Sequence, residues 1–155
     1  MNKYFYNYHN NLIGHITLMA DSDSIIEIKF GNIECKDFIK KDILIIADAI
    51  NQLEEYLNGK RKKFNIKINP IGTDFQKMVW NELINIPYGE TRSYKDIAMA
   101  IGNINSARAV GNANNANKIP LIIPCHRVIN SNGFIGGYSG GVIIKRRLLD
   151  TEQCK

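Results

Sequence analysis

The sequence predicts an α+β protein in which a small strand-rich domain precedes a helical domain. Three observations predict this class. Three runs rich in Ile, Tyr, Phe and Thr occupy most of residues 4–30 and are separated by polar turn residues, which is typical of an antiparallel meander. From residue 43 onward, apolar residues recur mostly at helical spacing. Asn-Pro-Ile-Gly at 69–72 is typical of a domain junction, so we expect domains at 1–70 and 71–155.

The first domain is expected to form one sheet covered by a helix. Its expected strands are residues 4–8, 12–20 and 25–30. Residues 43–57 place Ile, Leu and Ala near helical spacing, and Gly59 follows as a C-terminal stop. Such a helix would cover one face of the sheet. A short strand with alternating apolar residues is expected at 64–68.

The second domain is expected to contain a helix-turn-helix. Thr73 begins a capping box and therefore a first helix. Ser93 can cap a short second helix, which Gly102 ends. Ser106 can cap a third helix at 107–116, so a helix, a short turn and a helix follow one another.

The composition is that of an ordinary globular protein. The chain has 155 residues, of which 45% are hydrophobic and 23% charged, and no apolar run approaches the length of a membrane span. No secretory signal pattern is visible at its start. Three widely separated cysteines argue against a disulfide framework, and three histidines lack ligand spacing. We therefore expect a cytoplasmic protein that neither enters a membrane nor binds a metal.

Positive charge is concentrated in the second domain. The net charge is +5, and residues 97–149 contain six Lys or Arg but no Asp or Glu. A surface that faces a polyanion has this pattern, although a basic face with no partner would have it too. Lys145, Arg146 and Arg147 are consecutive on an expected final helix, so at most some of them could touch one partner.

The third helix has unusually little side-chain bulk. Ala and Gly dominate residues 107–116, and Arg108 is the only long cation among them. The minor groove of DNA is about 6 Å wide and an ordinary helix is about 10 Å across, so only a slim helix can enter the groove. Close packing against another helix is the alternative interpretation.

Cys125 is the candidate nucleophile. It adjoins His126 and Arg127 where a short apolar run breaks at a proline, and adjacent basic groups favour the reactive thiolate. Because neighbours on an extended chain point to opposite sides, we expect a water to bridge Cys125 and His126. Arg127 is expected to be a structural tie. Cys35 and Cys154 lack such neighbours, and we interpret both as bystanders.

Three ordered motifs resemble one known family. They are Ser-Ala-Arg-Ala-Val-Gly at 106–111, Ile-Pro-Cys-His-Arg-Val-Ile at 123–129 and Gly-Tyr-Ser-Gly-Gly at 137–141. Together they resemble the O6-alkylguanine-DNA alkyltransferases, also called methylated-DNA–protein-cysteine methyltransferases, over about residues 73–152. The resemblance implies a winged-helix-like second domain. It also implies a ribonuclease-H-like first domain, which this chain matches only in length and strand content.

The resemblance implies roles for five candidate catalytic residues. Cys125 would accept the alkyl group, His126 would activate it through a water, and Glu152 would orient the histidine. Asn117 would tie the active-site turn to the third helix. Tyr94 would turn the target phosphate and hydrogen-bond the flipped base at N3.

The resemblance also implies roles in binding DNA and the base. Arg108 would fill the position that the flipped base leaves. Val128 and Cys125 would offer backbone carbonyls to the guanine amino group, and Ser139 would donate to O6. The pocket walls would be Pro120 and Tyr138. The other implied DNA- or base-binding positions are Ser106, Ala107, Ala109, Gly111 and Asn114.

Three positions depart from the family pattern. Lys118 stands where a proline is common, and Asn114 and Asn115 stand where relatives often carry a larger apolar or cationic side chain. These departures leave the groove affinity and the pocket size open.

The function that the resemblance implies is direct reversal of DNA damage. A methyl or other small alkyl group would pass from guanine O6, and less efficiently from thymine O4, in double-stranded DNA to Cys125. No nearby residue could cleave the thioether product, so each molecule would act once, as a monomer bound in the minor groove and without a cofactor. Two alternatives stay open: a DNA-binding protein that senses alkylated bases without repairing them, and a cysteine hydrolase that turns over repeatedly.

Overall fold

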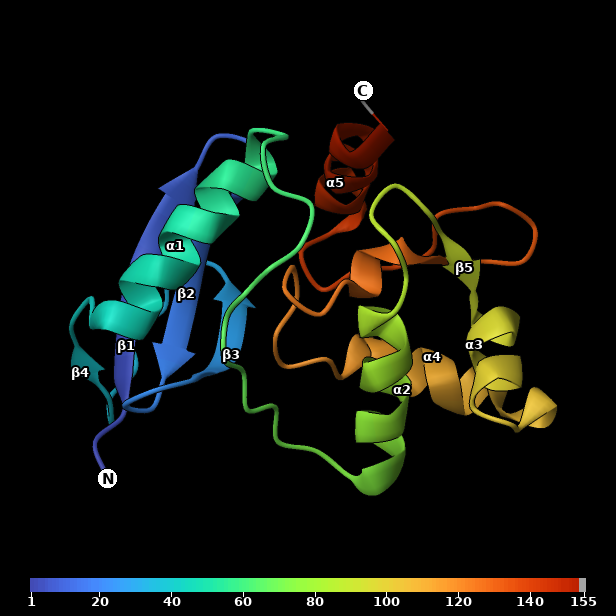
Figure 1. The fold of residues 1–155 in the computed structure, drawn as a ribbon, viewed down its shortest axis with the longest axis horizontal. Coiled ribbons are helices and arrows are strands. Elements are labelled where there is room, and N and C mark those ends of the chain that lie inside the picture. Colours follow the sequence, from blue (N-terminus) through green and yellow to red (C-terminus); the bar gives the residue numbers. More distant parts are fainter. Residues whose placement is uncertain (154–155) are drawn as a thin grey trace. The chain divides into compact units, whose positions relative to one another are not determined.

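A computed structural model describes residues 1–153 of the chain. The chain folds into two compact units, Met1–Ile71 and a second unit that begins at Gly72. Strands dominate the first unit and helices dominate the second, as the colours of Figure 1 show along the sequence. The predicted α+β class is therefore confirmed. Within the described residues, no helix combines the length and the apolar character that crossing a membrane requires.

The first unit is a four-stranded sheet with one helix against it. Its strands are β1 (Tyr4–Asn10), β2 (Gly14–Ala20), β3 (Ile25–Phe30) and β4 (Ile39–Lys40), in the order β3-β2-β1-β4. The three long strands run antiparallel, so the expected meander is confirmed. The helix α1 (Leu44–Leu57) runs along the sheet in Figure 1 and buries Ile46, Ala49 and Leu53.

Two details of the first unit differ from the sequence-based expectation. The short strand β4, which pairs parallel to β1, was not expected. Residues 64–68 form no strand, and only Ile68 bridges to Ile25. The Ile25 backbone bonds to Lys67 and Asn69, on either side of Ile68, and residues 64–67 form no further backbone pairs with β3. The alternating pattern identified an apolar segment but could not show how far its pairing extends.

The second unit contains four α-helices among its described residues. They are α2 (Asp74–Ile84), α3 (Tyr94–Ala100), α4 (Ala107–Asn115) and α5 (Val142–Gln153). Two short 3-10 helices, η1 (Ile104–Ser106) and η2 (Cys125–Arg127), join them, together with a parallel pair of two-residue strands, β5 (Arg92–Ser93) and β6 (Val128–Ile129). The core of this unit is centred on Trp80 of α2, whose indole Nε1 donates to the Ala113 carbonyl of α4 over 2.8 Å.

Capping chemistry explains where two of these helices begin. Thr73 accepts from the backbone N–H of Gln76, and the Gln76 side chain accepts in return from the Thr73 N–H, which completes a capping box before α2. Ser93 and Asp96 form the same arrangement before α3. The expected cap at Ser106 is wrong: its hydroxyl donates to the Asn103 carbonyl over 2.6 Å and leaves the first turn of α4 without a side-chain cap.

Candidate active site

Cys125 lies on a sharply bent connection between α4 and β6. Leu121 adopts φ 76°, a left-handed conformation that is uncommon for a branched side chain. Asn117 holds this bend, because its amide donates to the Ile123 carbonyl over 2.9 Å and its carbonyl accepts from the Ile119 N–H over 3.0 Å. Residues 121–123 form no strand, and Cys125 opens the 3-10 turn η2, so the expected extended chain at this point is wrong.

The Cys125 thiol is buried, with 3% of the residue exposed. Burial raises its pKa to about 11, against the lowering effects of a hydrogen bond from Asn117 and the charge of Lys145. A buried thiol in the resting protein is therefore protonated at neutral pH. Proximity to basic residues in the sequence does not by itself produce a thiolate here, so the thiol needs a group that can take its proton.

The side chains of His126, Arg127 and Glu152, the first two of which follow Cys125 on η2, form a buried network. Glu152 Oε2 lies 2.7 Å from His126 Nε2. The Arg127 guanidinium donates to both Glu152 oxygens, over 2.8 and 3.0 Å, and to the Ile86 carbonyl over 2.8 Å. The structural role that we expected for Arg127 is confirmed. The network connects η2 to α5 and fixes the orientation of the imidazole.

Charge in this network favours a neutral histidine facing a carboxylate. Burial would raise the pKa of Glu152, but hydrogen bonds from His126 and Arg127 bring it down to about 2. Burial lowers the pKa of His126. Since Glu152 contacts Nε2, the other ring nitrogen, Nδ1, is the atom through which His126 can accept a proton. A neutral, oriented imidazole next to a protonated thiol is suited to general-base work.

Tyr94 lies where α3, α4 and the segment after β6 meet. A Cβ built on Gly111 of α4 would lie 3.8 Å from the Tyr94 ring, and one built on Gly136 would lie 3.3 Å from its hydroxyl. Burial raises the pKa of Tyr94, and the charge of Cys125 raises it further. Tyr94 therefore keeps its proton and can act as a hydrogen-bond donor.

Lys145 is a site residue that the sequence did not reveal. It is fully buried on α5, and its ammonium group donates to the Val128 carbonyl over 2.6 Å and to the Gly137 carbonyl over 3.1 Å. A basic triplet on a helix is usually solvated, so its position in the sequence carried no signal of burial. The helical period does place residue 145 on the same face as Leu148, Leu149 and Glu152, and that signal could have found it.

The exposed face of α4 carries Arg108, Ala109, Asn112 and Asn115. Ala107 and Gly111 are half-buried. Asn114 does not lie on this face: it is 3% exposed, and its amide is directed at the Cys125 carbonyl over 3.5 Å. Asn114 faces the interior because residue 114 follows buried Val110 by one helical turn, and its predicted role in binding DNA or the base stays a prediction.

The remaining predicted residues lie in different surroundings. Pro120, Val128 and Ser106 are buried, whereas Ser139 is exposed. The half-buried Tyr138 meets the His126 ring edge-on, with ring centroids 6.3 Å apart.

The two cysteines that we interpret as bystanders lie outside the described part of the second unit. Cys35 is half-buried in the first unit, and Cys154 lies outside the described residues. Over residues 1–153, no group of three or more His, Cys, Asp or Glu side chains is placed to hold a metal ion.

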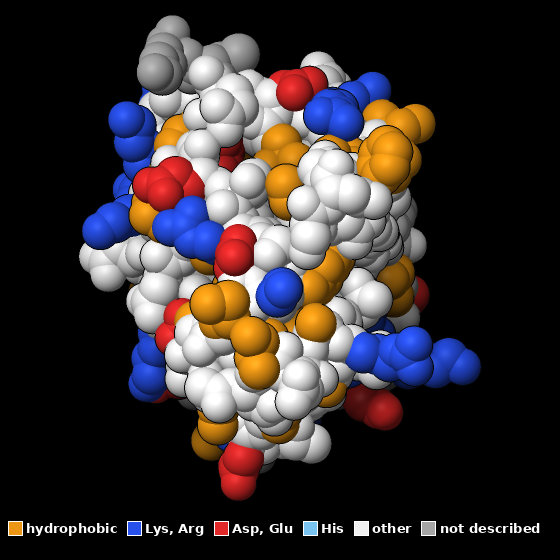
Figure 2. Space-filling view, turned by 90° about the vertical axis from the view of Figure 1, so that its right-hand side faces the viewer, with side chains coloured by type: hydrophobic (Ala, Val, Ile, Leu, Met, Phe, Trp, Pro, Cys, Tyr) orange, Lys and Arg blue, Asp and Glu red, His pale blue; other side chains and the backbone are white. Residues whose placement is uncertain are grey.

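The surface of the second unit is mixed in character. Figure 2 shows Lys and Arg atoms in separate groups, with acidic and hydrophobic side chains between them. Exposed hydrophobic residues of this unit include Met99, Ile104 and Phe134. The excess of positive charge in the sequence therefore does not form one continuous basic sheet on the face drawn in Figure 2.

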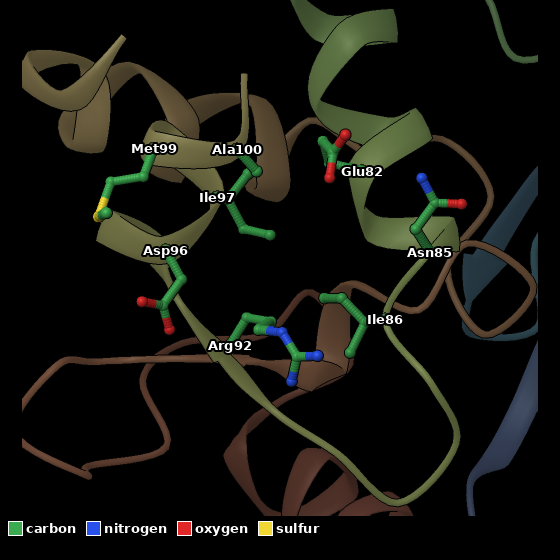
Figure 3. Close-up of a pocket in the computed structure, with 8 residues that line it drawn as sticks. All are labelled: Glu82, Asn85, Ile86, Arg92, Asp96, Ile97, Met99 and Ala100. Atoms are coloured by element: carbon green, nitrogen blue, oxygen red, sulfur yellow. The ribbon is translucent and has the colours of Figure 1, made fainter. Parts of the chain in front are cut away.

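A hollow of about 490 Å³ between α2 and α3 lies apart from these residues. Figure 3 shows the Arg92 guanidinium and the side chains of Ile86 and Ile97 at its centre. None of the residues that line it is a predicted site residue. The hollow therefore does not mark the candidate active site.

Comparisons with known proteins agree on one family. Residues 4–70 match the family model described as the ribonuclease-like domain of 6-O-methylguanine DNA methyltransferase, and residues 74–154 match that of its DNA binding domain. The methylated-DNA–protein-cysteine methyltransferase of Methanosarcina acetivorans is 46% identical over 144 residues, which cover 90% of this chain and 92% of that protein. The constitutive enzyme of the same name from Bacillus subtilis is 39% identical and covers 91% and 90%.

A solved structure supports the same assignment. The structure of Mycobacterium tuberculosis OGT in complex with DNA superposes with a TM-score of 0.90 at 38% identity, over 97% of this chain and 92% of that one. Family models match both halves of the chain, and the two relatives named above, at 46% and 39% identity, align with 90% and 91% of it. The protein therefore belongs to the 6-O-methylguanine DNA methyltransferase family.

Proposed function

We propose that the protein repairs O6-alkylguanine in double-stranded DNA by transferring the alkyl group to Cys125. The relatives named above are methyltransferases that act on methylated DNA, and one of them is solved with DNA bound. The observation that carries the choice of Cys125 is its burial on η2, the turn that also carries His126 of the oriented His126–Glu152 pair. Cys35 lies in the first unit, in a different domain from this pair.

The transfer is a displacement at a saturated carbon. His126 takes the thiol proton, directly or through a water, and the resulting thiolate attacks the alkyl carbon. The sulfur–carbon bond forms as the carbon–O6 bond breaks, and the bonding electron pair stays with guanine. Guanine then takes up a proton. The protonated Tyr94 is suited to donate at N3 and Ser139 at O6, so both would stabilise the departing base.

The lesion reaches Cys125 only if its nucleotide leaves the base stack, which costs a few kcal/mol in enzymes that flip bases. Arg108 stands on the exposed face of α4, beside Ala109 and near the half-buried Gly111. A slim helix with one long planar cation can enter the minor groove and fill the gap left by the base. The protein binds there as a monomer, and phosphate contacts give it little sequence preference.

Each molecule acts once. The product is a thioether, and the neighbouring groups, an imidazole, a carboxylate and a guanidinium, cannot cleave a carbon–sulfur bond. The protein is therefore consumed as a reagent, and the transfer balances without a cofactor or a metal.

Intact-mass measurement tests the proposal directly. After incubation with a duplex that contains one O6-methylguanine, the protein should gain about 14 Da, and the mass should map to the Cys125 peptide. Cys125→Ala should abolish the gain, and Cys35→Ala, the matched control, should leave it unchanged.

Three outcomes would overturn the proposal. Methylation at Cys35 or Cys154 would move the acceptor elsewhere. Lesion binding with no gain in mass would indicate a sensor of alkylated bases. Continued turnover of an ester or amide substrate beyond one equivalent would indicate a hydrolase.

A further inference from the structure

Among the residues that the structure describes, Lys145 is the one buried cation near Cys125 that the proposed transfer does not use. Arg127, the other cation of this region, is paired with Glu152. Lys145 instead donates to two backbone carbonyls, those of Val128 and Gly137. Burial lowers its pKa to about 8, and the charge of Cys125 acts in the opposite direction. A fully buried lysine is costly, so one held only by carbonyls calls for a functional explanation.

The two carbonyls belong to the segments that surround the acceptor thiol. Val128 follows η2, the turn that carries Cys125, and Gly137 lies in the loop that leads to α5. The Lys145 ammonium therefore bridges these segments. Gly136 has φ +75°, and a Cβ there would lie 3.7 Å from Lys145 Nζ and 3.3 Å from the Tyr94 hydroxyl. The positive φ favours glycine at residue 136, and the contacts place this loop beside both groups.

The charges around Lys145 make it an electrostatic partner of the thiol. The titratable and charged groups in its surroundings are Cys125, His126 and Arg127 on η2 and Tyr94 on α3. The charge of Lys145 lowers the pKa of Cys125, which burial raises. Glu152 is bound to His126 and Arg127, so the carboxylate of this region is already engaged with other groups.

We propose that Lys145 is a positioning residue for alkyl transfer, which joins the Cys125 turn to the 136–139 loop and supplies the positive charge that stabilises the Cys125 thiolate. This inference rests on the proposed function, because it assumes that Cys125 reacts as a thiolate. It also explains how a carbonyl of Val128 is kept in place: one lone pair binds Lys145, and the second stays available to a base amino group.

The test measures thiolate formation without DNA. Iodoacetamide reacts with thiolates, so its rate of reaction with Cys125 across pH, followed by peptide mass, reports the acceptor alone. Cys35 in the same molecule serves as an internal reference. In Lys145→Met, the rate at which iodoacetamide modifies Cys125 at pH 8 should fall about tenfold. This fall corresponds to a rise of about one pH unit in the midpoint of the pH–rate profile of Cys125. The Cys35 rate should not change.

Further variants separate charge from packing. Arg146→Met removes an exposed cation one residue away on the same helix and should leave the Cys125 midpoint unchanged. Lys145→Gln keeps a hydrogen-bond donor but no charge and should lose as much as Lys145→Met. Lys145→Arg keeps the charge and should restore part of the rate. If Lys145→Gln reacts like the unsubstituted protein, Lys145 only holds the loop and the electrostatic proposal is overturned.

Two controls keep the test decisive. If the variants unfold, NMR titration of Lys145 Nζ gives the pH at which Lys145 loses its proton in the unsubstituted protein. Below that pH the Cys125 rate should rise about tenfold per pH unit, and just above it the rise should be smaller, because the stabilising charge is lost. A tenfold rise per unit that continues through this pH would overturn the inference. Methyl transfer from DNA to the unsubstituted protein is scored separately, so its absence would refute the proposed function and not the thiol–lysine coupling.

Discussion

Asn114 and Asn117 are both buried near Cys125, but the hydrogen bonding of their side chains differs. Both polar atoms of the Asn117 side chain have partners: Nδ2 donates to the Ile123 carbonyl, and Oδ1 accepts from the Ile119 N–H. Asn114 makes one long bond of 3.5 Å, and its Oδ1 has no hydrogen-bond partner among the described residues. Unsatisfied buried polar groups reduce stability, whereas satisfied ones are costly to remove. The same substitution should therefore cost much more stability at Asn117 than at Asn114.

We expect Asn117→Leu to lower the free energy of unfolding by about 2 to 4 kcal/mol, because it leaves two buried backbone groups without partners. Asn114→Leu should change it by less than about 1 kcal/mol, since it removes an amide that is itself poorly satisfied. Denaturant unfolding of both variants measures this difference. Equal losses would show that Asn114 is satisfied in a way that its contacts do not reveal.

At the scale of single residues, the sequence identified some members of the site and missed others. Cys125, His126 and Arg127 were recognisable because they are adjacent and occur in a family motif. Glu152 and Lys145 come from α5, and only folding brings them to the thiol. For Glu152, the resemblance supplied the role and the structure supplies the contact with His126. For Lys145, the sequence offered only a basic triplet, and the burial of its first member depends on tertiary packing.

Among the elements, α4 shows how one helix serves two neighbours. Val110, Ala113 and Asn114 face the interior, and the opposite side carries Arg108 and Asn112. Gly111 lies between these faces, against the Tyr94 ring. The two interpretations of the small residues, groove entry and close packing, are therefore compatible, because they apply to different sides of α4.

Substitution of Gly111 should distinguish a small side chain from a large one. A Cβ at residue 111 would make ordinary contact with Tyr94, so Gly111→Ala should retain transfer and raise helix stability by up to about 1 kcal/mol. Gly111→Leu should displace Tyr94 and slow transfer to Cys125 from both duplex DNA and a free O6-alkylguanine base. Single-turnover rates on the two substrates measure this effect.

Asn112→Leu is the matched control for that comparison. It places the same leucine side chain one residue along α4, on the exposed face. It should slow the reaction with duplex DNA and leave the free base unaffected. If Gly111→Leu also affected only the duplex, Tyr94 would not be positioned by α4.

At the scale of the whole molecule, the proposed partner is a polyanion, yet the charges on the face drawn in Figure 2 are dispersed. The face in Figure 2 mixes cations with acidic and apolar groups, so attraction along the backbone must be combined with shape. Substitutions of Arg108 can separate the two contributions, because Arg108 could act through its charge or by filling the position that the flipped base leaves in the stack. Affinity for duplex DNA should fall with rising salt in either case.

We expect Arg108→Ala to slow repair of O6-methylguanine in duplex DNA on the order of tenfold or more, because nothing then fills the gap left by the flipped base. Reaction with the free base should not change. Arg108→Lys keeps the charge but not the planar group, so it should recover salt-dependent binding without recovering the repair rate. A loss of equal size on the duplex and the free base would contradict this role.

The sequence by itself determined the α+β class, the three long strands, the helices α2, α3, α4 and α5, and the position of the cysteine motif in the chain. These features depend on local signals: β-branched runs, helical spacing, capping boxes at Thr73 and Ser93, and an ordered set of motifs. Local signals failed at residues 64–68, where pairing with the distant Ile25 extends over one position only, and at Ser106, whose hydroxyl bonds to the nearby Asn103 carbonyl instead of capping α4.

Only the tertiary structure decided the electrostatics of the acceptor thiol. Burial raises the pKa of Cys125, and the opposing charge comes from a lysine twenty residues further along the chain. The free energy of a charge depends on how much water surrounds it and which groups lie within a few ångströms, and neither quantity is local in sequence.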